Sequence, residues 1–292
     1  MKTTTQNGYA KINLHLDITG IMPNGFHSVN TVMHSLSLCD TVTLTPNDGG
    51  KYTVDCNISG VPCGEDNLAV RAAMLFKQAV PTAPYAHIYI EKRIPMAAGL
   101  AGGSADAAAV LRGMNELCGE PLSMEELCAI GSRLGSDVPF CICVRPAFAT
   151  GKGDLLEPFP AMPDCTVVVA CAGEGVSTPA AYKMLDTLHG GFAPDCGYVP
   201  RPLSALRESA QAGDIEKLTE SMYNIFEEPV LAVRPVAKKL KELMLEVGAL
   251  GAMMSGSGPS VFGIFTDREK ALRAAEEINQ QGVTPHICTP IA

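Results

Sequence analysis

A run of small residues between positions 95 and 111 constrains the fold of this chain more than any other feature. The segment reads PMAAGLAGGSADAAAVL, so glycines give way to an alanine-rich stretch. Apolar residues then recur at helical spacing and predict a helix that begins near Ser104 and runs to about Leu117. A helix that opens directly from a glycine turn presents unpaired N–H groups at the positive end of its dipole. The segment is therefore typical of a phosphate-binding loop.

Two better-known phosphate loops do not fit this segment. No Lys-Ser or Lys-Thr pair follows the last glycine, which excludes a Walker A loop. The spacing Gly99-x-x-Gly102-Gly103 differs from the G-x-G-x-x-G dinucleotide fingerprint. Glycines that only relieve a tight strand-to-helix turn are the alternative interpretation.

The rest of the chain predicts an α+β fold. The stretch 10–18 has apolar residues at even positions and polar residues at odd positions, as in a half-buried strand. Further strands are expected at 29–38, 41–45, 86–90, 165–171, 260–265 and 284–288. Helices are expected from Asn67, from a capping box at Ser123 and Glu126, and at 202–211, 233–247 and 268–280. Strands in runs and between helices favour α+β over a doubly wound sheet, and EPFP at 157–160 is the expected domain boundary.

Charge and cysteine content narrow the function classes. The chain has 22 basic and 31 acidic residues and a net charge of −9. This argues against nucleic-acid and anionic-membrane surfaces, which need a basic face, but it allows a small anionic substrate. The eleven cysteines show no C-x-x-C spacing and are interpreted as reduced structural thiols. The first residues lack the apolar core of a signal peptide and no apolar run is long enough to span a membrane, so a cytoplasmic protein is expected.

Three motifs together resemble the GHMP kinases, the superfamily of galactokinase, homoserine kinase, mevalonate kinase and phosphomevalonate kinase. The pattern P-x-x-x-G-L-x-G-G-S-x-D-A-A at 95–108 resembles their ATP-phosphate loop. AKINL at 10–14 resembles their N-terminal motif, and MSGSGPSVF at 254–262 resembles their C-terminal glycine motif. Four segments are jointly similar to one branch, the 4-diphosphocytidyl-2-C-methyl-D-erythritol kinases: KINL at 11–14, GFH at 25–27, PMAAGL at 95–100 and LGSDVPF at 134–140. The resemblance covers essentially the whole chain.

This resemblance implies a two-domain GHMP kinase fold. Residues 1–160 would form an N-terminal domain similar to domain 2 of ribosomal protein S5, which carries the ATP-phosphate loop. Residues 161–292 would form a ferredoxin-like α/β sandwich.

The resemblance also implies an ATP- and Mg²⁺-dependent kinase. Its substrate would be 4-diphosphocytidyl-2-C-methyl-D-erythritol, phosphorylated at the 2-hydroxyl in the non-mevalonate isoprenoid pathway. A superfamily kinase for another small alcohol, of the homoserine or mevalonate type, and a catalytically silent ligand-binding relative are the alternatives. The expected partner is this small molecule, with no nucleic acid and no membrane, and the chain is expected to be a monomer or a homodimer.

Two residues are candidates for the chemistry. Phosphoryl transfer to an alcohol needs positioned phosphates, charge neutralisation and a group that accepts or orients the hydroxyl proton. Asp137, in a mostly apolar segment, suits the last role, and Lys11, on the polar side of its strand, is the cation expected to pair with it. The resemblance implies the same two residues as catalytic. A surface lysine and a capping aspartate are the alternative roles.

Binding residues follow from the same resemblance. The triphosphate is expected on the loop, whose residues are Pro95, Met96, Ala97, Ala98, Gly99, Leu100, Ala101, Gly102, Gly103, Ser104 and Ala105. Ser104 would offer its hydroxyl to a phosphate or to Mg²⁺, or cap the helix, and Asn67 would lie near the adenine or serve only as an N-cap. Phe26 would stack on the cytosine and His27 would contact its polar edge, the alternative for His27 being a solvated turn residue. The second-rank candidates for the sugar-alcohol and diphosphate end are Asn13, Thr178 and Asn224.

Four positions depart from the family pattern. Ala97 and Ala101 stand where relatives often have glycine, and the loop is expected to keep its shape with negative φ at both. Ala105 replaces a second serine, which removes one hydroxyl contact to phosphate. Phe26 stands where tyrosine is common, so stacking is kept while the phenolic hydrogen bond is lost.

Overall fold

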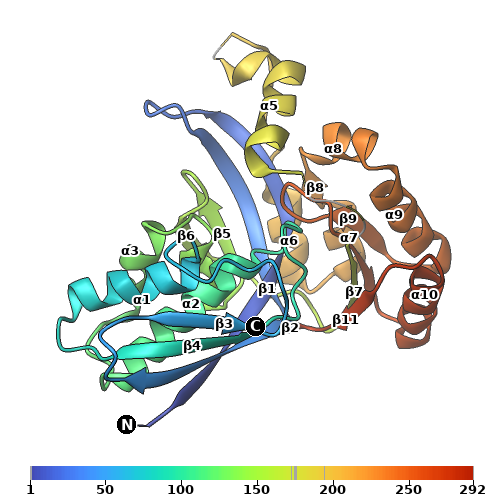
Figure 1. Cartoon of the computed structure of the whole chain (residues 1–292). Coiled ribbons are helices and arrows are strands. Elements are labelled where there is room, and N and C mark those ends of the chain that lie inside the picture. The colour runs from blue at the N-terminus through green and yellow to red at the C-terminus, as the bar shows by residue number, and fades with distance from the viewer. Residues whose placement is uncertain (1, 172, 174–175, 194, 292) are drawn as a thin grey trace. The chain divides into compact units, whose positions relative to one another are not determined.

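A computed structural model describes residues 2–171, 173, 176–193 and 195–291 and shows two compact units (Figure 1). Unit 1 consists of residues 1–10, 39–96 and 101–144, and unit 2 of residues 11–38, 97–100 and 145–292. Two long strands, β1 (Thr4–Ile21) and β2 (His27–Asn47), contribute residues to both units.

Unit 1 is a sheet covered by helices. The second half of β2 pairs antiparallel with β4 (Tyr85–Glu91), which pairs parallel with β3 (Thr53–Cys56). The helices are α1 (Leu68–Ala79), α2 (Gly102–Leu117), α3 (Met124–Ser132) and α4 (Val138–Cys143). Helix α1 packs along α2, as Figure 1 shows, and α2 also contacts α3 and α4. The alanine-rich face of α2 is fully buried, which lets these helices approach closely.

Helix starts in unit 1 follow from local side-chain chemistry. Asn67 caps α1 by accepting a hydrogen bond from the Ala69 N–H at 2.9 Å. The predicted capping box is confirmed, since Ser123 and Glu126 exchange hydrogen bonds at the start of α3. The prediction that α2 begins near Ser104 is wrong by two residues. The helix begins at Gly102, because the left-handed backbone of Ala101 (φ 58°, ψ 28°) turns the chain directly into it, and Ser104 does not cap it.

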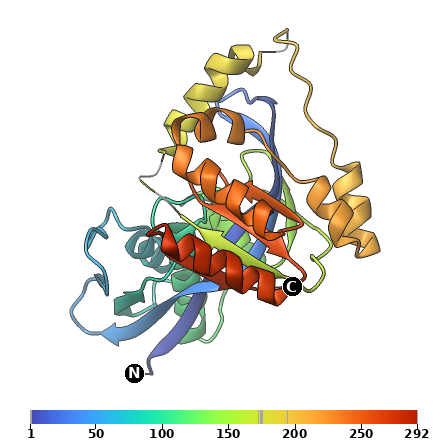
Figure 2. The same ribbon diagram turned by 90° about the vertical axis from the view of Figure 1, so that its right-hand side faces the viewer.

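Unit 2 contains an antiparallel four-stranded sheet in the order β11-β7-β10-β9. Its strands are β7 (Thr166–Ala170), β9 (Gly251–Met254), β10 (Val261–Phe265) and β11 (Pro285–Cys288). Helices α9 (Pro235–Val247) and α10 (Arg268–Gln280) cover this sheet (Figure 2). The chain order β7-α9-β9-β10-α10-β11 with this strand order is the ferredoxin-like arrangement, as expected.

The remaining elements of unit 2 are inserted before α9 or pair with the long strands. Between β7 and α9 lie α5 (Thr178–His189), the short 3₁₀ helix η1 (Gly190–Phe192), α6 (Ser204–Ala212), α7 (Ile215–Glu220), β8 (Tyr223–Asn224) and α8 (Glu227–Val233). Strand β8 pairs parallel with the second half of β1. The first half of β2 pairs with β5 (Ala147–Thr150) and β12 (Pro290–Ile291), and β5 pairs with β6 (Leu155–Pro158).

Two sequence-based expectations about the elements are wrong. The two strands expected at 29–38 and 41–45 are one strand, β2, which continues through the polar residues between them. The helix expected at 233–247 is interrupted at Arg234, whose backbone (φ −127°, ψ 69°) is not helical, because Pro235 follows it and disfavours the helical conformation there. In the segment 157–160, where the domain boundary is expected, Glu157 pairs with Phe148 in the β5–β6 ladder and Phe159 is buried.

Two features of the described residues concern the compartment. All eleven cysteines are free thiols. Within the described residues, none of the helices has both the length and the apolar character that crossing a bilayer requires.

Candidate active site

Lys11 is a buried lysine on β1, so the alternative of a surface lysine is wrong. The residue is only 4% exposed, and its Nζ donates a hydrogen bond to Asn13 Oδ1 at 2.7 Å. Asn13 in turn donates to Thr31 Oγ1 at 2.8 Å and accepts from the Gly256 N–H at 2.9 Å. The ammonium is thus held in one orientation by an amide that is itself fixed from two sides.

The middle of the glycine-rich loop contacts the turn between β9 and β10 within unit 2. Leu100 accepts a hydrogen bond from the Lys11 N–H at 3.1 Å. Ser255 Oγ donates to the Gly99 carbonyl at 3.0 Å, and the Ser260 N–H donates to the Ala98 carbonyl at 3.2 Å. The N-terminal motif, part of the loop and the C-terminal glycine motif therefore meet at one place in the fold.

Glycine is required on both sides of the contact between the loop and the β9–β10 turn. A side chain on Gly99, whose φ is 78°, would overlap the Ser255 carbonyl oxygen. A side chain on Gly256, whose φ is 56°, would come within 2.9 Å of the Gly99 carbonyl oxygen and 3.2 Å of Lys11 Nζ. The backbones consequently approach each other, and the lysine, as closely as the chain allows.

Two of the second-rank candidates lie against this turn. Asn224 is 3% exposed and donates from Nδ2 to the carbonyls of Met254 and Gly256, each at 2.8 Å. Both amide hydrogens are therefore occupied, and its role in this structure is to hold the turn. The hydroxyl of Thr178, the first residue of α5, lies 3.3 Å from Ser257 Oγ.

The end of the loop lies in unit 1 and forms the start of α2. The first loop N–H to donate within the helix is that of Ala105, which bonds the Ala101 carbonyl at 2.8 Å. The N–H groups of Gly102, Gly103 and Ser104 precede it and are therefore the ones free of the helix ladder. The helix thus begins within the loop, as the predicted anion site requires, and anion binding there stays a prediction.

The expectation of negative φ at the two alanine departures is wrong. Ala97 has φ 50° and Ala101 has φ 58°, both in the left-handed region. The loop keeps the left-handed backbone conformation that glycine adopts freely. In alanine this conformation brings Cβ close to a carbonyl oxygen and is sterically unfavourable. Ala105, where a second serine is common, is fully buried, and Met96 is 49% exposed.

The protein side chains that could bind a metal ion suit an Mg²⁺ ion that arrives bound to the phosphates of a nucleotide. Among the described residues, no group of three His, Cys, Asp or Glu side chains could hold a metal ion. Ser104 offers a hydroxyl in the first turn of α2, and a methyl group at Gly135 would lie 4.0 Å from it. Mg²⁺ typically keeps several waters and binds one or two protein oxygens plus substrate phosphates. A single hydroxyl ligand such as that of Ser104 is consistent with this coordination.

Asp137 stands immediately before α4 in unit 1. It occupies the N-cap position with φ −78° and ψ −16°, yet its side chain makes no capping hydrogen bond. The alternative of a capping aspartate is therefore wrong, and the half-buried carboxylate keeps its acceptor sites for another group. Lys11 lies in unit 2 and Asp137 in unit 1, so their pairing stays a prediction.

Asn67 serves as the N-cap of α1. Its Oδ1 accepts from the Ala69 N–H and its Nδ2 donates to the Pro62 carbonyl at 2.8 Å. The residue is 7% exposed. Its predicted place near an adenine is untested by these contacts.

His27 belongs to an aromatic cluster in unit 2, so it is no solvated turn residue. Its Nε2 lies 2.7 Å from Asp186 Oδ1. Its ring centroid lies 4.6 Å from that of Tyr182 and 5.8 Å from that of Phe192. The preceding Phe26 is 60% exposed, which leaves its ring open to a ligand.

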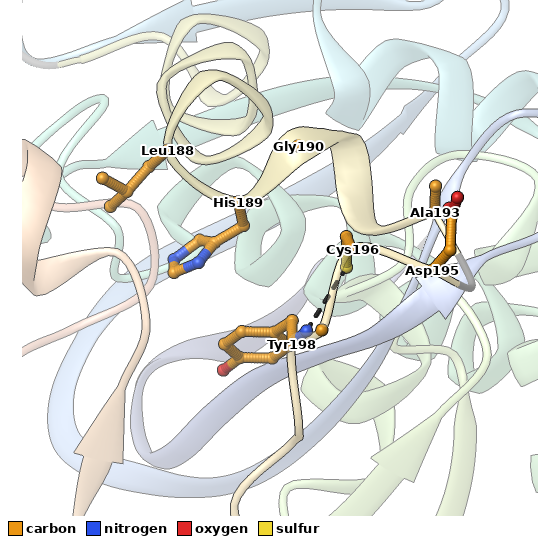
Figure 3. A pocket seen from close by; sticks show the side chains of 8 residues that line it. Leu188, His189, Gly190, Ala193, Asp195, Cys196 and Tyr198 are labelled. Atoms are coloured by element: carbon orange, nitrogen blue, oxygen red, sulfur yellow. Dashed lines mark hydrogen bonds between the residues drawn. The ribbon is translucent and has the colours of Figure 1, made fainter.

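A pocket of about 510 Å³ opens beside this cluster, lined by residues between Leu188 and Tyr198 (Figure 3). The rings of His189 and Tyr198 lie on its wall with centroids 4.8 Å apart, and Phe192 lies 5.1 Å from Tyr198. The Tyr198 N–H donates to Cys196 Sγ at 3.5 Å, the contact drawn in Figure 3. The pocket is thus lined by aromatic side chains, His189 and Tyr198, and by polar ones such as Asp195.

The polar side of β1 continues past Asn13 to two further buried groups. Burial, together with the charge of Arg201, lowers the pKa of His15 to about 4. Burial raises the pKa of Asp17, although Tyr198 and the Arg201 N–H both donate to its carboxylate. Every second residue from Lys11 to Asp17 is therefore a buried polar side chain.

Comparison with known proteins gives the family. The GHMP kinases N terminal domain model matches residues 67–145, and the GHMP kinases C terminal model matches residues 204–284. The chain is 42% identical over 264 residues to the 4-diphosphocytidyl-2-C-methyl-D-erythritol kinase of Exiguobacterium sibiricum, covering 90% of each chain. It is 38% identical to the enzyme of that name from Alkaliphilus metalliredigens, over 96% of this chain and 94% of the relative. The chain belongs to the 4-diphosphocytidyl-2-C-methyl-D-erythritol kinase family of GHMP kinases.

Solved structures of GHMP kinases share the fold. A crystal structure of 4-(cytidine 5′-diphospho)-2C-methyl-D-erythritol kinase superposes with a TM-score of 0.80 at 31% identity, over 99% of this chain and 100% of that one. Homoserine kinase from Cytophaga hutchinsonii superposes with a TM-score of 0.74 at 16% identity, over 100% and 96% of the chains, which shows a shared fold only. GHMP kinases are ATP-dependent phosphotransferases for small molecules. The two family models lie on either side of residue 160, and a domain boundary at that residue stays a prediction.

Sequence reasoning missed Tyr182 and Asp186, which contact His27 from α5. A usable signal was present: Thr178, Tyr182 and Asp186 are spaced four residues apart and so lie on one helix face. Ser255 was named only as part of the C-terminal motif, and its bond to the loop carbonyl requires the tertiary structure.

Proposed function

We propose that this chain transfers the γ-phosphoryl group of ATP to the 2-hydroxyl of 4-diphosphocytidyl-2-C-methyl-D-erythritol. The observation that carries the proposal is the convergence at Lys11 of three motifs far apart in the sequence. The ammonium lies beside Gly256 and is oriented by Asn13, and the backbone N–H of Lys11 bonds the loop at the Leu100 carbonyl. Such a cluster suits the charge neutralisation that phosphoryl transfer demands.

The phosphates are assigned to the glycine-rich loop. The free N–H groups at the start of α2 and the dipole of that helix attract the β- and γ-phosphates without a basic side chain. Mg²⁺ would be held by the phosphates and Ser104, and when bound it supplies neutralisation of the phosphate charge. Asn67 is assigned a place near the adenine.

Lys11 and Asp137 are assigned to the reacting groups. The Asp137 carboxylate, free of capping, accepts or orients the proton of the attacking hydroxyl. The Lys11 ammonium steadies the charge on the transferring group, and Asn13 keeps the ammonium aimed. Thr178, next to the turn that carries Gly256, is assigned to the substrate between the two ends.

The cytidine end is assigned to the His27 cluster. The exposed ring of Phe26 offers a stacking face, and His27 presents a ring whose other nitrogen is fixed by Asp186. Tyr182 and the pocket at 188–198 add aromatic surface on the same unit. This cluster favours a nucleotide-bearing substrate over homoserine or mevalonate, which have no base to stack.

The deciding experiment is a kinase assay with ATP and a panel of three alcohols, the diphosphocytidyl alcohol, homoserine and mevalonate. The diphosphocytidyl alcohol is expected to be the preferred substrate. Asp137→Asn is expected to lower kcat about 10²- to 10⁴-fold, the usual contribution of a positioned proton acceptor. Asp48→Asn, at an exposed loop position, is the matched control and is expected to match wild type. Activity of Asp137→Asn within a few-fold of wild type would contradict the assignment, and preference for homoserine would contradict the substrate.

A cytoplasmic location is part of the same proposal. It is supported by the free thiols of all eleven cysteines and by the cellular supply of ATP.

A further inference from the structure

Unit 1 contains a buried lysine that the chemistry proposed above does not use. Lys92 follows β4, and its Nζ donates to Asp40 Oδ2 at 2.5 Å and to Asp106 Oδ2 at 2.8 Å. The three residues are 8%, 0% and 5% exposed respectively. One ammonium therefore joins β2, the end of β4 and the first turns of α2.

The backbone around Lys92 is fixed as firmly as its side chain. Asp40 Oδ1 accepts from the N–H groups of Arg93 and Ile94, at 2.6 and 2.8 Å. Asn57 Oδ1 accepts from the Lys92 N–H at 2.7 Å, and Asn57 Nδ2 donates to the Lys92 carbonyl at 3.2 Å. The segment that enters the glycine-rich loop at Pro95 is thereby anchored to two neighbouring strands.

The ammonium also lies close to the other end of the loop. A methyl group on Gly102, the first residue of α2, would lie 3.2 Å from Lys92 Nζ. Asp106 lies one helical turn after Gly102, so the ammonium bonds one end of the first turn and lies beside the other. That turn carries the free N–H groups of Gly102, Gly103 and Ser104.

The charge of Lys92 is already neutralised. Burial alone would lower its pKa, but the two carboxylates outweigh that effect and raise it, so the ammonium persists. Burial and the charge of Asp40 raise the pKa of Asp106, but one ionised carboxylate is enough to balance the ammonium, so Lys92 has no net positive charge to offer a phosphate. Asp106 Oδ1 has no partner among the described residues, and a buried ion group left partly unsatisfied is a poor source of stability.

We propose that Lys92 is a positioning residue for nucleotide binding, which fixes the first turn of α2 through Asp106 and Gly102 and so aims the free N–H groups of that turn. The inference rests on the proposed function, which assigns those groups to the phosphates of ATP. Misplacing such donors by a fraction of an ångström weakens every hydrogen bond they make at once.

The first test replaces the ammonium by an apolar side chain of similar length, Lys92→Met. MgATP affinity is measured directly by calorimetry, and the kinase assay gives KM for each substrate and kcat. The dissociation constant of MgATP is expected to rise about tenfold or more, while KM for the diphosphocytidyl alcohol and kcat at saturating ATP stay within about threefold. Lys51→Met, at an exposed lysine of the same unit, is the matched control and is expected to match wild type.

A second variant separates positioning from stability. Lys92→Met leaves two buried carboxylates without a cation and is expected to lower the unfolding temperature. Lys92→Met/Asp106→Asn removes one of those charges, so the unfolding temperature is expected to recover while MgATP affinity stays low. Recovery of affinity together with stability would overturn the proposal, as would unfolding of both variants, because each result makes Lys92 a residue of the fold alone.

Failure of this inference is distinguishable from failure of the proposed function. If wild type binds MgATP and transfers phosphate but Lys92→Met binds MgATP equally well, only the positioning role is wrong. If wild type binds no MgATP, the phosphate assignment itself is wrong.

Discussion

Two alanines hold the ends of the loop in a backbone conformation that suits glycine. The left-handed region brings the side-chain Cβ too near the following carbonyl and costs about 1–2 kcal/mol for most residues. Ala97 and Ala101 both adopt it, at φ 50° and 58°. The surrounding contacts, among them the Ser260 bond to Ala98 next in the chain, must offset that cost.

Replacing either alanine by glycine is therefore expected to stabilise the protein. Ala97→Gly and Ala101→Gly each relieve the steric cost but add freedom to the unfolded chain, so a net gain of up to about 1 kcal/mol in the free energy of unfolding is expected. Urea denaturation monitored by circular dichroism measures it.

Ala205→Gly supplies the control for this pair. Ala205 is an exposed residue inside α6 with no positive φ, so glycine there is expected to cost about 0.5–1 kcal/mol. If the two loop variants lose as much as Ala205→Gly does, the alanines are not strained.

At the scale of elements, the glycine-rich loop and the β9–β10 turn pack against each other and stabilise each other's conformation. Gly99 and Gly256 let the two backbones meet, and Ser255 bonds across the contact. The turn has two backbone hydrogen bonds of its own, from the Ser255 N–H to the Ser260 carbonyl and from the Gly258 N–H to the Ser255 carbonyl, so it offers the loop a defined surface to pack against.

Replacing a glycine at this contact by alanine is expected to reduce activity by more than a general loss of stability would. Gly99→Ala pays the left-handed penalty and also drives the loop away from Ser255, so kcat/KM for ATP is expected to fall at least tenfold. Gly282→Ala has nearly the same φ, 75° against 78°, with nothing within 4 Å of the new side chain. Gly282→Ala is expected to lose about 1 kcal/mol of stability and to keep its activity, whereas Gly99→Ala should lose more stability, because its side chain also overlaps the Ser255 carbonyl oxygen, and should lose activity as well. Equal activities would show that the close approach is dispensable.

Elements with strong local signals were predictable, and those decided by tertiary context were not. The helix 268–280 is confirmed to the residue, because Asp267 caps it and its alanines mark one buried face. The break at Arg234 was missed because an apolar period continues across it. The left-handed alanines were missed because sequence reports residue type, whereas φ is imposed here by contacts with distant segments.

At the scale of the whole molecule, the acidic balance and an anionic substrate are compatible. The sequence motifs predict Lys11, Asn13 and the loop as site residues, because each stands in a recognisable pattern, and in the structure Lys11 bonds both Asn13 and the loop residue Leu100. The partners of these residues, such as Asp186 for His27 across 159 positions, depend on the path of the chain. Phosphate affinity assigned to backbone N–H groups, one lysine and a metal needs no basic surface, so a net charge of −9 is no obstacle.

Buried histidines make the stability of the molecule depend on pH. The folded pKa of His15 is about 4, against 6.5 in the unfolded chain, so between these values the unfolded state binds more protons. The contribution of His15 is fully present above pH 6.5 and is lost as the pH falls towards 4. At about 1.4 kcal/mol for each unit of pKa, the loss approaches about 3 kcal/mol.

His15→Phe isolates this contribution, because phenylalanine keeps a ring against Tyr223 and cannot take up a proton. His34 and His286 also have lowered pKa values from burial, so wild type is expected to lose stability on acidification for more than one reason. The stability difference between wild type and His15→Phe should therefore shift in favour of the variant between pH 7 and pH 5, as measured by urea midpoints at fixed ionic strength. A difference between wild type and His15→Phe that stays constant over this range would mean that His15 titrates in the folded protein as it does in the unfolded chain.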